Sequence, residues 1–462
     1  MVFSSLTFLI YFLPIVLVVY YVVPQKLKNT VLLIASILFY AYGEPKYIIL
    51  FLISILFSYI FGILIDGAKS GKLKKLFLIF GILLHIGFLV YFKYIDFLIG
   101  NINLIFNLKI DLVNVALPIG ISFYTFQIIS YLVDVYKGKI KVQRNIIKYA
   151  TFVAMFPQLI AGPIVRYEDI EKSLDKKEIN LKNISNGIER FIIGLSKKVI
   201  LANLLCTFCN VYLQSKEPTM IFSIFYSFAC FMQIYFDFSG YSDMAIGLGK
   251  MLGFSYPENF DFPICSKSIT EFWRRWHITL GMWFRDYIYI PLGGNRKGVI
   301  RHLINIFLVW ALTGLWHGAS NVFIVWGLYF GVNLVLEKYV IKKVLDKIPS
   351  IFSHIYTIIL VLISFVIFNS NTITDAFLVI KNMFGIGCDF INKESFYYIS
   401  SNFLLFLVSA ILCTDILKRV LKLKKVERIV NIIKPVIYFS LLIICISFIT
   451  VESFNPFIYF RF

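Results

Sequence analysis

The sequence predicts an all-α protein that crosses a membrane many times. Three observations predict this class. The first two are that 59% of the 462 residues are hydrophobic and only 15% are charged, whereas ordinary soluble chains are about 25% charged. The third is a formal net charge of +19, from 45 lysine and arginine residues against 26 acidic ones. An apolar and basic chain is typical of a polytopic membrane protein whose charges lie in short loops. No nucleic-acid partner is expected, because no solvated basic domain is visible.

The apolar runs give the number of helices. A helix needs roughly 20 apolar residues to cross a hydrocarbon layer of about 30 Å. The clearest runs are residues 2–23, 47–65, 76–92, 112–135, 220–236, 319–336, 355–368, 403–417 and 436–451. Shorter or interrupted runs are residues 31–42, 146–164, 188–211, 244–254 and 302–315. Together they predict about 10 to 13 transmembrane or re-entrant helices in one integral-membrane domain over residues 1–462.

The loop charges predict an orientation. Residues 26–28, 69–75 and 137–148 are basic, whereas the alternate loops at 43–46 and 101–114 are nearly neutral. Because basic loops stay in the cytoplasm, the N-terminus is expected outside. The first run lacks the basic start and small-residue cleavage site of a signal peptide, so we interpret it as a retained span.

Residues 255–301 form the longest stretch without a spanning run and are expected to be an amphipathic cytoplasmic loop. All six tryptophans and three of the five histidines lie between 273 and 326. Ser268 or Thr270 can cap a helix there. The aromatic and apolar residues that follow recur at helical spacing: Trp273, Trp276, His277, Leu280, Phe284 and Tyr287. Pro291 and Gly293 then end the pattern in a turn.

Two interpretations of this loop stay open, and they are compatible. Its aromatic face can lie in the membrane interface, with arginines toward anionic lipid headgroups. Alternatively, the basic side recruits an anionic cytoplasmic substrate. The residues that would form the basic side are Arg274, Arg275, Arg296 and Lys297.

His317, within the region 302–331, is the strongest catalytic candidate. An ionisable side chain at membrane depth is costly and is by default a functional hypothesis; the alternative is a structural imidazole bonded to a neighbouring helix. Apolar surroundings favour the neutral imidazole, which suits a general base. Gly314 and Gly318 leave room for close backbone approach. His277 has no metal-ligand spacing to any partner, so no metal site is expected.

A further polar cluster lies within an apolar run. Asp237 and Asp243 flank a Ser-Gly-Tyr-Ser sequence that predicts a break in the helix. Either carboxylate can cap the broken helix, and a discontinuous pair can also line a cavity. No P-loop, G-x-S-x-G elbow or H-E-x-x-H motif occurs, which excludes the corresponding soluble enzymes.

Several segments together resemble the membrane-bound O-acyltransferase (MBOAT) family, in its bacterial alginate O-acetyltransferase-like branch. They are MVFSSLTFLIYFLP, FYAYGEPKY, FPQLIAGPIVRY, QIYFDFSGYSDMAIGLGKMLGF, FWRRWHITLGMWFRDYIYIPLGGNRKG, GLWHGA and NPFIYFRF. The resemblance covers nearly the whole chain, and the set is specific in this order and spacing.

The resemblance implies a ring of membrane helices around a central channel in the bacterial cytoplasmic membrane. It implies that His317 of GLWHGA is the principal catalytic residue and that His277 of RRWH is a second one. The acyl donor is expected to be acetyl-CoA, with no bound cofactor. Arg274, Arg275, Arg296 and Lys297 are expected to meet its phosphates, and Trp316 to line the passage.

The acceptor is expected to be a hydroxyl at the outer face. The family also implies an exported or membrane-anchored SGNH-like acetyltransferase partner and a polysaccharide as final acceptor, in addition to membrane lipid. Two alternatives remain: a D-alanyl transferase of the teichoic-acid export type, and a polysaccharide or lipid transporter without covalent chemistry.

Overall fold

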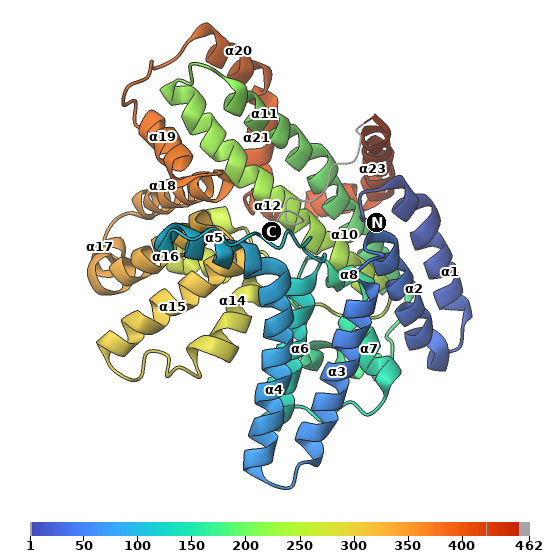
Figure 1. Cartoon of the computed structure of the whole chain (residues 1–462). Helices are drawn as coiled ribbons and strands as arrows, with labels where there is room; N and C mark the ends of the chain where they lie inside the picture. Colours follow the sequence, from blue (N-terminus) through green and yellow to red (C-terminus); the bar gives the residue numbers. More distant parts are fainter. Residues whose placement is uncertain (1, 422, 452–462) are drawn as a thin grey trace. The chain divides into compact units, whose positions relative to one another are not determined.

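The computed structural model describes residues 2–421 and 423–451, so the closing NPFIYFRF segment lies outside the described residues. In this part of the chain every regular element is a helix (Figure 1), which confirms the all-α class. The described residues divide into two compact units. Helices α10 (Leu181–Ser196) and α12 (Met220–Met251) contribute residues to both units.

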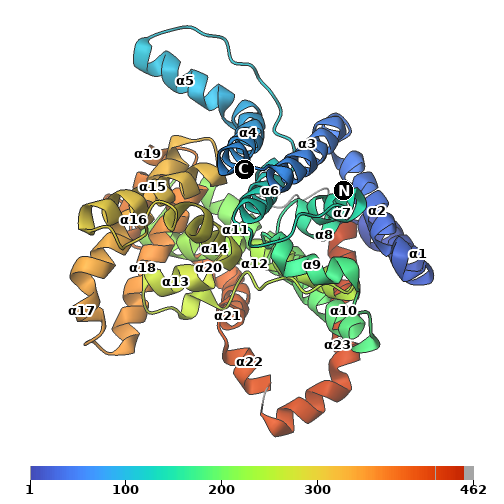
Figure 2. The ribbon, with the colours of Figure 1, turned by 90° about the horizontal axis from the view of Figure 1, so that it is seen from below.

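The first unit comprises the described residues up to Phe191 together with Ser242–Glu258. Its remaining helices are α1 (Leu13–Val22), α2 (Lys28–Gly43), α3 (Ile48–Gly67), α4 (Gly71–Leu89), α5 (Ile95–Phe106), α6 (Ile121–Tyr136), α7 (Ile146–Ala154), α8 (Phe156–Leu159) and α9 (Tyr167–Asp175). Helices α3, α4 and α6 pack together, and α2 packs on α7. Figure 2 shows the long connection that follows α5 and returns the chain to α6.

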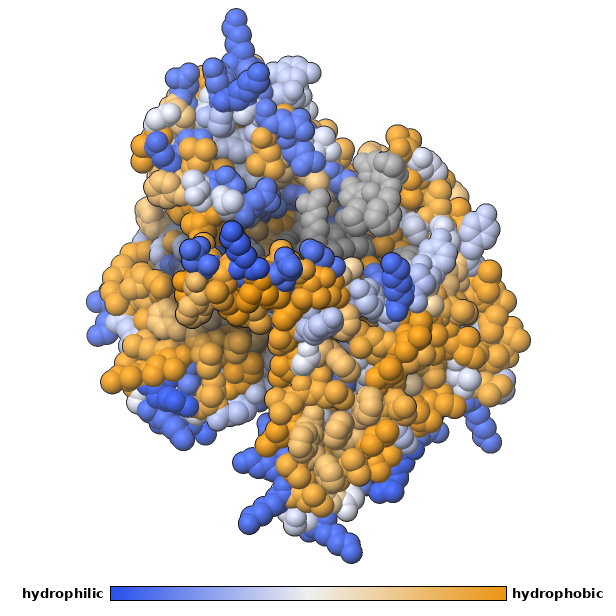
Figure 3. Space-filling model, viewed as in Figure 1, coloured by the Kyte–Doolittle hydropathy of each residue, from blue (hydrophilic) through white to orange (hydrophobic). Residues whose placement is uncertain are grey.

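Helices α3 and α4 keep much of their apolar surface exposed. Only 33% of the most apolar part of α3 is buried, and only 17% of the most apolar part of the helical stretch Gly71–Phe106. Figure 3 shows hydrophobic residues along these helices and hydrophilic residues where their lower ends join. A helix that is apolar on all sides yet exposed is suited to contact with lipid.

The second unit comprises Ile192–Tyr241 and the described residues from Asn259 onward. Its other helices are α11 (Asn203–Gln214), α13 (Ile269–Arg275), α14 (Ile278–Phe284), α15 (Val299–His317), α16 (Asn321–Leu336), α17 (Lys342–Leu345), α18 (Ser350–Asn369), α19 (Ile373–Met383), α20 (Lys393–Ser401), α21 (Phe403–Leu412), α22 (Ile416–Leu421) and α23 (Lys424–Val451). Helices α15 and α16 form a close antiparallel pair, and α18 packs on α16 (Figure 1).

Glycines set the separation of α15 and α16. A Cβ at Gly314 would lie 2.1 Å from the carbonyl oxygen of Phe323, and one at Gly327 would lie 2.2 Å from that of Trp310. Any side chain at either position would push the helices apart, as expected where small residues allow membrane helices to approach closely. This confirms the close approach that the sequence predicts around Gly314.

Eight described helical stretches are long and apolar enough to cross a membrane, or nine if the bent pair α20–α21 is one span. They are Ile48–Gly67, Gly71–Phe106, Leu181–Gln214, Met220–Met251, Val299–His317, Asn321–Leu345, Ser350–Asn369 and Ile432–Val451. The first apolar run instead forms the shorter helix Thr7–Val22. The multi-pass class is confirmed, whereas the eight or nine described spans are fewer than the roughly 10 to 13 transmembrane or re-entrant helices predicted.

Two expectations about helix boundaries are wrong. The predicted break between Asp237 and Asp243 does not exist, because α12 continues from Met220 to Met251. Its glycines serve contacts instead: a Cβ at Gly240 would lie 2.7 Å from the carbonyl oxygen of Gly194. The apolar run from residue 112 is helical only from Ile121, after Pro118 and after Gly120 at φ 76°.

Candidate active site

The turn between α15 and α16 places His317. This histidine is the last residue of α15, and Ser320 caps the next helix by accepting a hydrogen bond from the Val322 N–H at 3.3 Å. Gly314, one turn before His317, is in direct contact with the backbone of α16. The close helix pair therefore fixes the backbone that carries the imidazole.

Aromatic rings enclose His317. Its ring centroid lies 4.9 Å from that of Trp326 on α16, 5.0 Å from that of Trp316 and 5.3 Å from that of Phe368 on α18, each nearly perpendicular to it. Only 2% of His317 is exposed. The apolar surroundings predicted for this histidine are confirmed.

His277 lies between α13 and α14, in a left-handed conformation with φ 43° and ψ 52°. Its Nδ1 is 3.1 Å from Oδ1 of Asn259. The ring packs edge-on against Phe238 of α12, with centroids 4.6 Å apart, and lies 5.6 Å from Trp316. Like His317, it is buried.

The fold thus brings both candidate histidines to the same tryptophan. Trp316 is a neighbour of each ring, although the two histidines come from different elements. Burial, together with the charge of His317 nearby, holds the pKa of His277 well below its usual range. No cluster of three or more histidine, cysteine or acidic side chains suited to a metal ion occurs in the described part of the chain.

The predicted continuous helix from Ser268 to Tyr287 is wrong. Ser268 does cap α13, by accepting the Glu271 N–H at 3.0 Å, but that helix ends at Arg275. The backbone then takes a left-handed conformation at His277, immediately before α14 starts. The Ile278 N–H bonds to the Asn259 carbonyl oxygen at 3.0 Å, so contact with a preceding loop overrides the helical periodicity.

The tryptophans of this region lie on different surfaces. Trp273 packs on Trp310 with ring centroids 4.6 Å apart. Trp276 is buried and stacks on Phe272. The single aromatic face expected from helical spacing is therefore divided between two groups of contacts.

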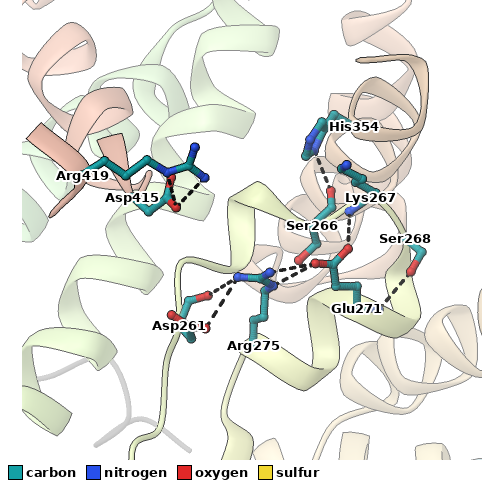
Figure 4. A network of polar contacts seen from close by, with 9 residues as sticks. All are labelled: Asp261, Ser266, Lys267, Ser268, Glu271, Arg275, His354, Asp415 and Arg419. Carbon is teal, nitrogen blue, oxygen red and sulfur yellow. Dashed lines mark hydrogen bonds and ion pairs between the residues drawn. The ribbon is translucent and has the colours of Figure 1, made fainter. Parts of the chain in front are cut away.

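The four predicted basic residues have different surroundings. Arg275 is ion-paired with Glu271 at 2.9 Å and with Asp261 at 3.6 Å, so it fastens the preceding loop to α13 (Figure 4). Arg274 is exposed and lines a cavity of about 1400 Å³. Arg296 and Lys297 are exposed in the turn before α15 and are not among the residues that line this cavity.

The cavity lies within the second unit, between α13–α14 and α15–α18. Its apolar lining includes Leu280 and Trp310, together with Trp273. Its basic lining residues are Lys267, Arg274, Arg285, Lys338 and Lys342, and its acidic ones are Glu271, Glu337 and Asp346. A mixed apolar and basic lining suits an anionic molecule with an apolar part.

Comparison with known proteins decides the family. Residues 140–370 match the family described as MBOAT, membrane-bound O-acyltransferase family. Over 395 residues the chain is 43% identical to the probable alginate O-acetylase AlgI of Pseudomonas putida, covering 84% of this chain and 81% of that relative. The chain belongs to the membrane-bound O-acyltransferase family. It is accordingly a multi-pass membrane protein and an O-acyltransferase.

Other relatives in this family carry different names. The peptidoglycan O-acetyltransferase of Helicobacter pylori is 35% identical over 428 residues, covering 84% of this chain and 80% of that protein. The teichoic acid D-alanyltransferase of Bacillus subtilis is 33% identical over 227 residues, covering 46% of this chain and 57% of that protein. The similarity to acetyltransferases therefore extends over far more of the acyltransferase described here.

The two carboxylates of α12 are ion-paired in this acyltransferase. Asp237 lies 2.6 Å from Nζ of Lys198, and both side chains are almost fully buried. Asp243 accepts hydrogen bonds from Arg190 at 2.9 and 3.0 Å, and Arg190 also pairs with Glu258. They do not cap a broken helix, because α12 is unbroken, and their contacts indicate a structural role.

Two residues near the site, Asn259 and Glu337, were not predicted from the sequence. Asn259 contacts His277, and Glu337 accepts hydrogen bonds from the first backbone N–H groups of α13, at Ile269 and Thr270. Neither residue is part of a helical repeat. Each contacts an element that lies many residues away in the sequence. An acidic residue at the end of an apolar run is the signal that could have indicated Glu337, whereas Asn259 lies between Glu258 and Asp261 and carries no such signal.

Proposed function

We propose that this protein moves an acetyl group from a cytoplasmic thioester donor to a hydroxyl at the outer face of the bacterial cytoplasmic membrane. The donor is acetyl-CoA, and the product is an O-acetylated cell-surface or exported polysaccharide. The names of relatives that align with 84% of the chain, for alginate and peptidoglycan acetylation, support this assignment.

The observation that carries the proposal is the pair of buried histidines beside Trp316. His317 takes the proton of the incoming hydroxyl as its oxygen attacks the thioester carbonyl. The new C–O bond forms, the C–S bond breaks, and the thiol leaves with the proton. His277 orients the reactants at the same site, and the aromatic walls around His317 exclude water that would hydrolyse the donor.

The cavity beside α13 is the proposed donor site. Arg274 and neighbouring basic side chains of the cavity would meet the phosphates of CoA, while Trp273 and Trp310 would contact its apolar part. Arg296 and Lys297 would act earlier, by attracting the donor to the membrane surface. Arg275, being ion-paired, supports α13 rather than the ligand.

The proposed topology places the donor and the acceptor on opposite faces of the membrane. The basic loops face the cytoplasm and the N-terminus lies outside. The acetyl group passes to the outer face, where an exported or membrane-anchored SGNH-like acetyltransferase partner delivers it to the polysaccharide. No metal or bound cofactor takes part.

The test is an assay in proteoliposomes with acetyl-labelled CoA and an extract of the cell-surface polymer, with and without the exported partner. We expect wild type to transfer label and His317→Ala to lose transfer by about 10²-fold or more, as for removal of a general base. His277→Ala should also lose transfer. The matched control is His354→Gln, since His354 bonds the Ser266 carbonyl oxygen at 3.0 Å and glutamine can replace that bond.

Two results would overturn the proposal. If label never leaves CoA but a D-alanyl thioester on a carrier protein is consumed, the protein is a D-alanyl transferase. If polymer crosses the membrane equally well with His317→Ala and no acyl donor is consumed, it is a transporter. Protein recovered by size exclusion confirms that each variant is folded.

A further inference from the structure

We infer that Asn259 is a positioning residue that fixes the tautomer of His277, with the proton on Nδ1 and an acceptor lone pair on Nε2. This inference rests on the proposed acetyl transfer and assigns His277 a role within it. When a substrate binds, Nε2 of the neutral His277 ring accepts a hydrogen bond from an O–H or N–H group of that substrate and does not donate one.

The hydrogen bonds around Asn259 determine the orientation of its amide. Its Oδ1 atom lies 3.3 Å from the backbone nitrogen of Thr279 and 2.8 Å from the Thr279 hydroxyl. A backbone N–H can only donate, so the amide atom facing it must be the oxygen and not the nitrogen. The orientation of this side chain is therefore set by the backbone of α14.

The tautomer of His277 follows from that orientation. Nδ1 of His277 is 3.1 Å from the same Oδ1 atom, which has no hydrogen to donate. A hydrogen bond between them requires the proton on Nδ1. In the neutral imidazole Nε2 then carries a lone pair.

The Nε2 side of the His277 ring has no hydrogen-bond partner among the described residues. Nε2 of His277 is buried and makes no hydrogen bond to any residue that the structure describes. A buried acceptor without a partner costs about 1–3 kcal/mol, so such atoms require an explanation. A substrate hydrogen provides one, since the ring lies beside Trp316 and His317.

The backbone indicates the same role. His277 is one of four described non-glycine residues with positive φ, and the hydrogen bond from the Ile278 N–H to the Asn259 carbonyl oxygen holds it there. Strained residues of this kind are found where a side chain must be aimed. Asn259 thus holds both the main chain and the ring of His277.

His302 provides the contrast. Its Nδ1 lies 2.7 Å from the hydroxyl of Tyr339 and its Nε2 lies 3.3 Å from Nζ of Lys338. Both ring nitrogens of His302 are therefore occupied by protein, as expected of a structural histidine. His277 has one nitrogen fixed and the other directed to a ligand.

The groups that face His277 determine its pH dependence. The elements packed against it contribute Phe238 from α12, Trp316 from α15, and the neutral Asn259 and Thr279; the titratable neighbour is His317. Asp237, next to Phe238, is ion-paired with Lys198. Because the pKa of His277 lies well below its usual range, transfer should persist below pH 6.5 and fall when Nε2 is protonated.

The experiment measures kcat and KM for acetyl-CoA as a function of pH in the full-length protein. Asn259→Leu should lower kcat or kcat/KM by about 10- to 100-fold at every pH, as for loss of a partner that orients a histidine. Asn259→Asp keeps the oxygen but adds a negative charge, which raises the pKa of His277. Its acid limb should therefore move to higher pH, with transfer recovering in alkaline buffer.

Thr279→Val is the matched control. It removes another hydrogen bond to Asn259 Oδ1 but leaves the contact with His277, so the pH profile should keep its wild-type position. A rise in KM for acetyl-CoA in Asn259→Leu identifies an N–H group of the donor as the partner of Nε2, and a fall in kcat at saturating donor identifies the acceptor hydroxyl.

The inference fails if Asn259→Leu has the wild-type kcat, KM and pH profile, or if Asn259→Asp and Thr279→Val shift the acid limb equally. The proposed function fails differently, because wild type would then transfer no acetyl group at any pH. Recovery of monodisperse protein and its melting temperature show whether a variant has lost activity by unfolding.

Discussion

The carboxylates of α12 and the histidines near α15 are buried or partly buried polar groups, yet their hydrogen-bonding surroundings differ. Asp237 and Asp243 each face a basic partner, Lys198 and Arg190, within hydrogen-bond distance. In the other region, Nε2 of His277 and the indole nitrogens of Trp273 and Trp326 have no hydrogen-bond partner among the described residues.

This difference separates structural from chemical roles. A buried charge is tolerated in an apolar protein when its partner is present, and removing that partner leaves a penalty of several kcal/mol. A buried acceptor without a partner, such as Nε2 of His277, costs free energy, and a hydrogen bond from a ligand would offset that cost.

Lys198→Met should destabilise the protein most. It leaves Asp237 buried without its partner at 2.6 Å, which costs about 3–5 kcal/mol. Thermal unfolding in detergent measures the loss, and acetyl transfer per folded molecule should stay at the wild-type level. The double variant Lys198→Met with Asp237→Leu should recover stability; if transfer is abolished in folded double variant, the pair has a chemical role and the comparison fails.

Gly314→Val should reduce both stability and transfer. Its side chain would overlap the Phe323 carbonyl oxygen, and overpacking of this kind costs about 1–3 kcal/mol while separating the helices that hold His317. Gly87→Ala is the control, because nothing lies within 4 Å of a Cβ at that position. Equal melting temperatures for the two variants would contradict the role assigned to the α15–α16 contact.

The pH dependence of stability should show the smallest effect. The pKa of His277 is lowered in the folded state, so the unfolded chain binds more protons below about pH 6.5. Stability from the neutral ring is full above that pH and is lost as the pH falls. The melting temperature should drop between pH 7.5 and 5.5 more steeply in wild type than in His277→Asn; parallel curves would show that His277 does not titrate differently on folding.

Much of the fold could be predicted from the sequence because the length and apolar composition of a segment indicate a membrane helix. The apolar run at residues 47–65 became α3, and residues 355–368 lie within α18. The break predicted at the Ser-Gly-Tyr-Ser sequence is wrong. Serine and glycine often end helices in water-soluble proteins, but between packed membrane helices they allow close contact.

The sequence proposes residues for the candidate site but does not predict how they are arranged. His317 is identifiable from the sequence as an ionisable group in an apolar segment, whereas His277 is proposed from the family resemblance. Their common neighbour Trp316, the helix break at His277 and the bond to Asn259 depend on tertiary contacts. Periodicity describes one helix at a time, so it cannot reveal a loop residue that interrupts another helix.

The left-handed backbone at His277 has a consequence for selection experiments. Glycine and asparagine adopt this conformation at least as readily as histidine does. In a variant library scored only for expression in the membrane, both should therefore be accepted at position 277. Scored for a product of the enzyme, the same library should keep histidine. The difference between the two scores at position 277 measures how strongly histidine is required for activity rather than for folding.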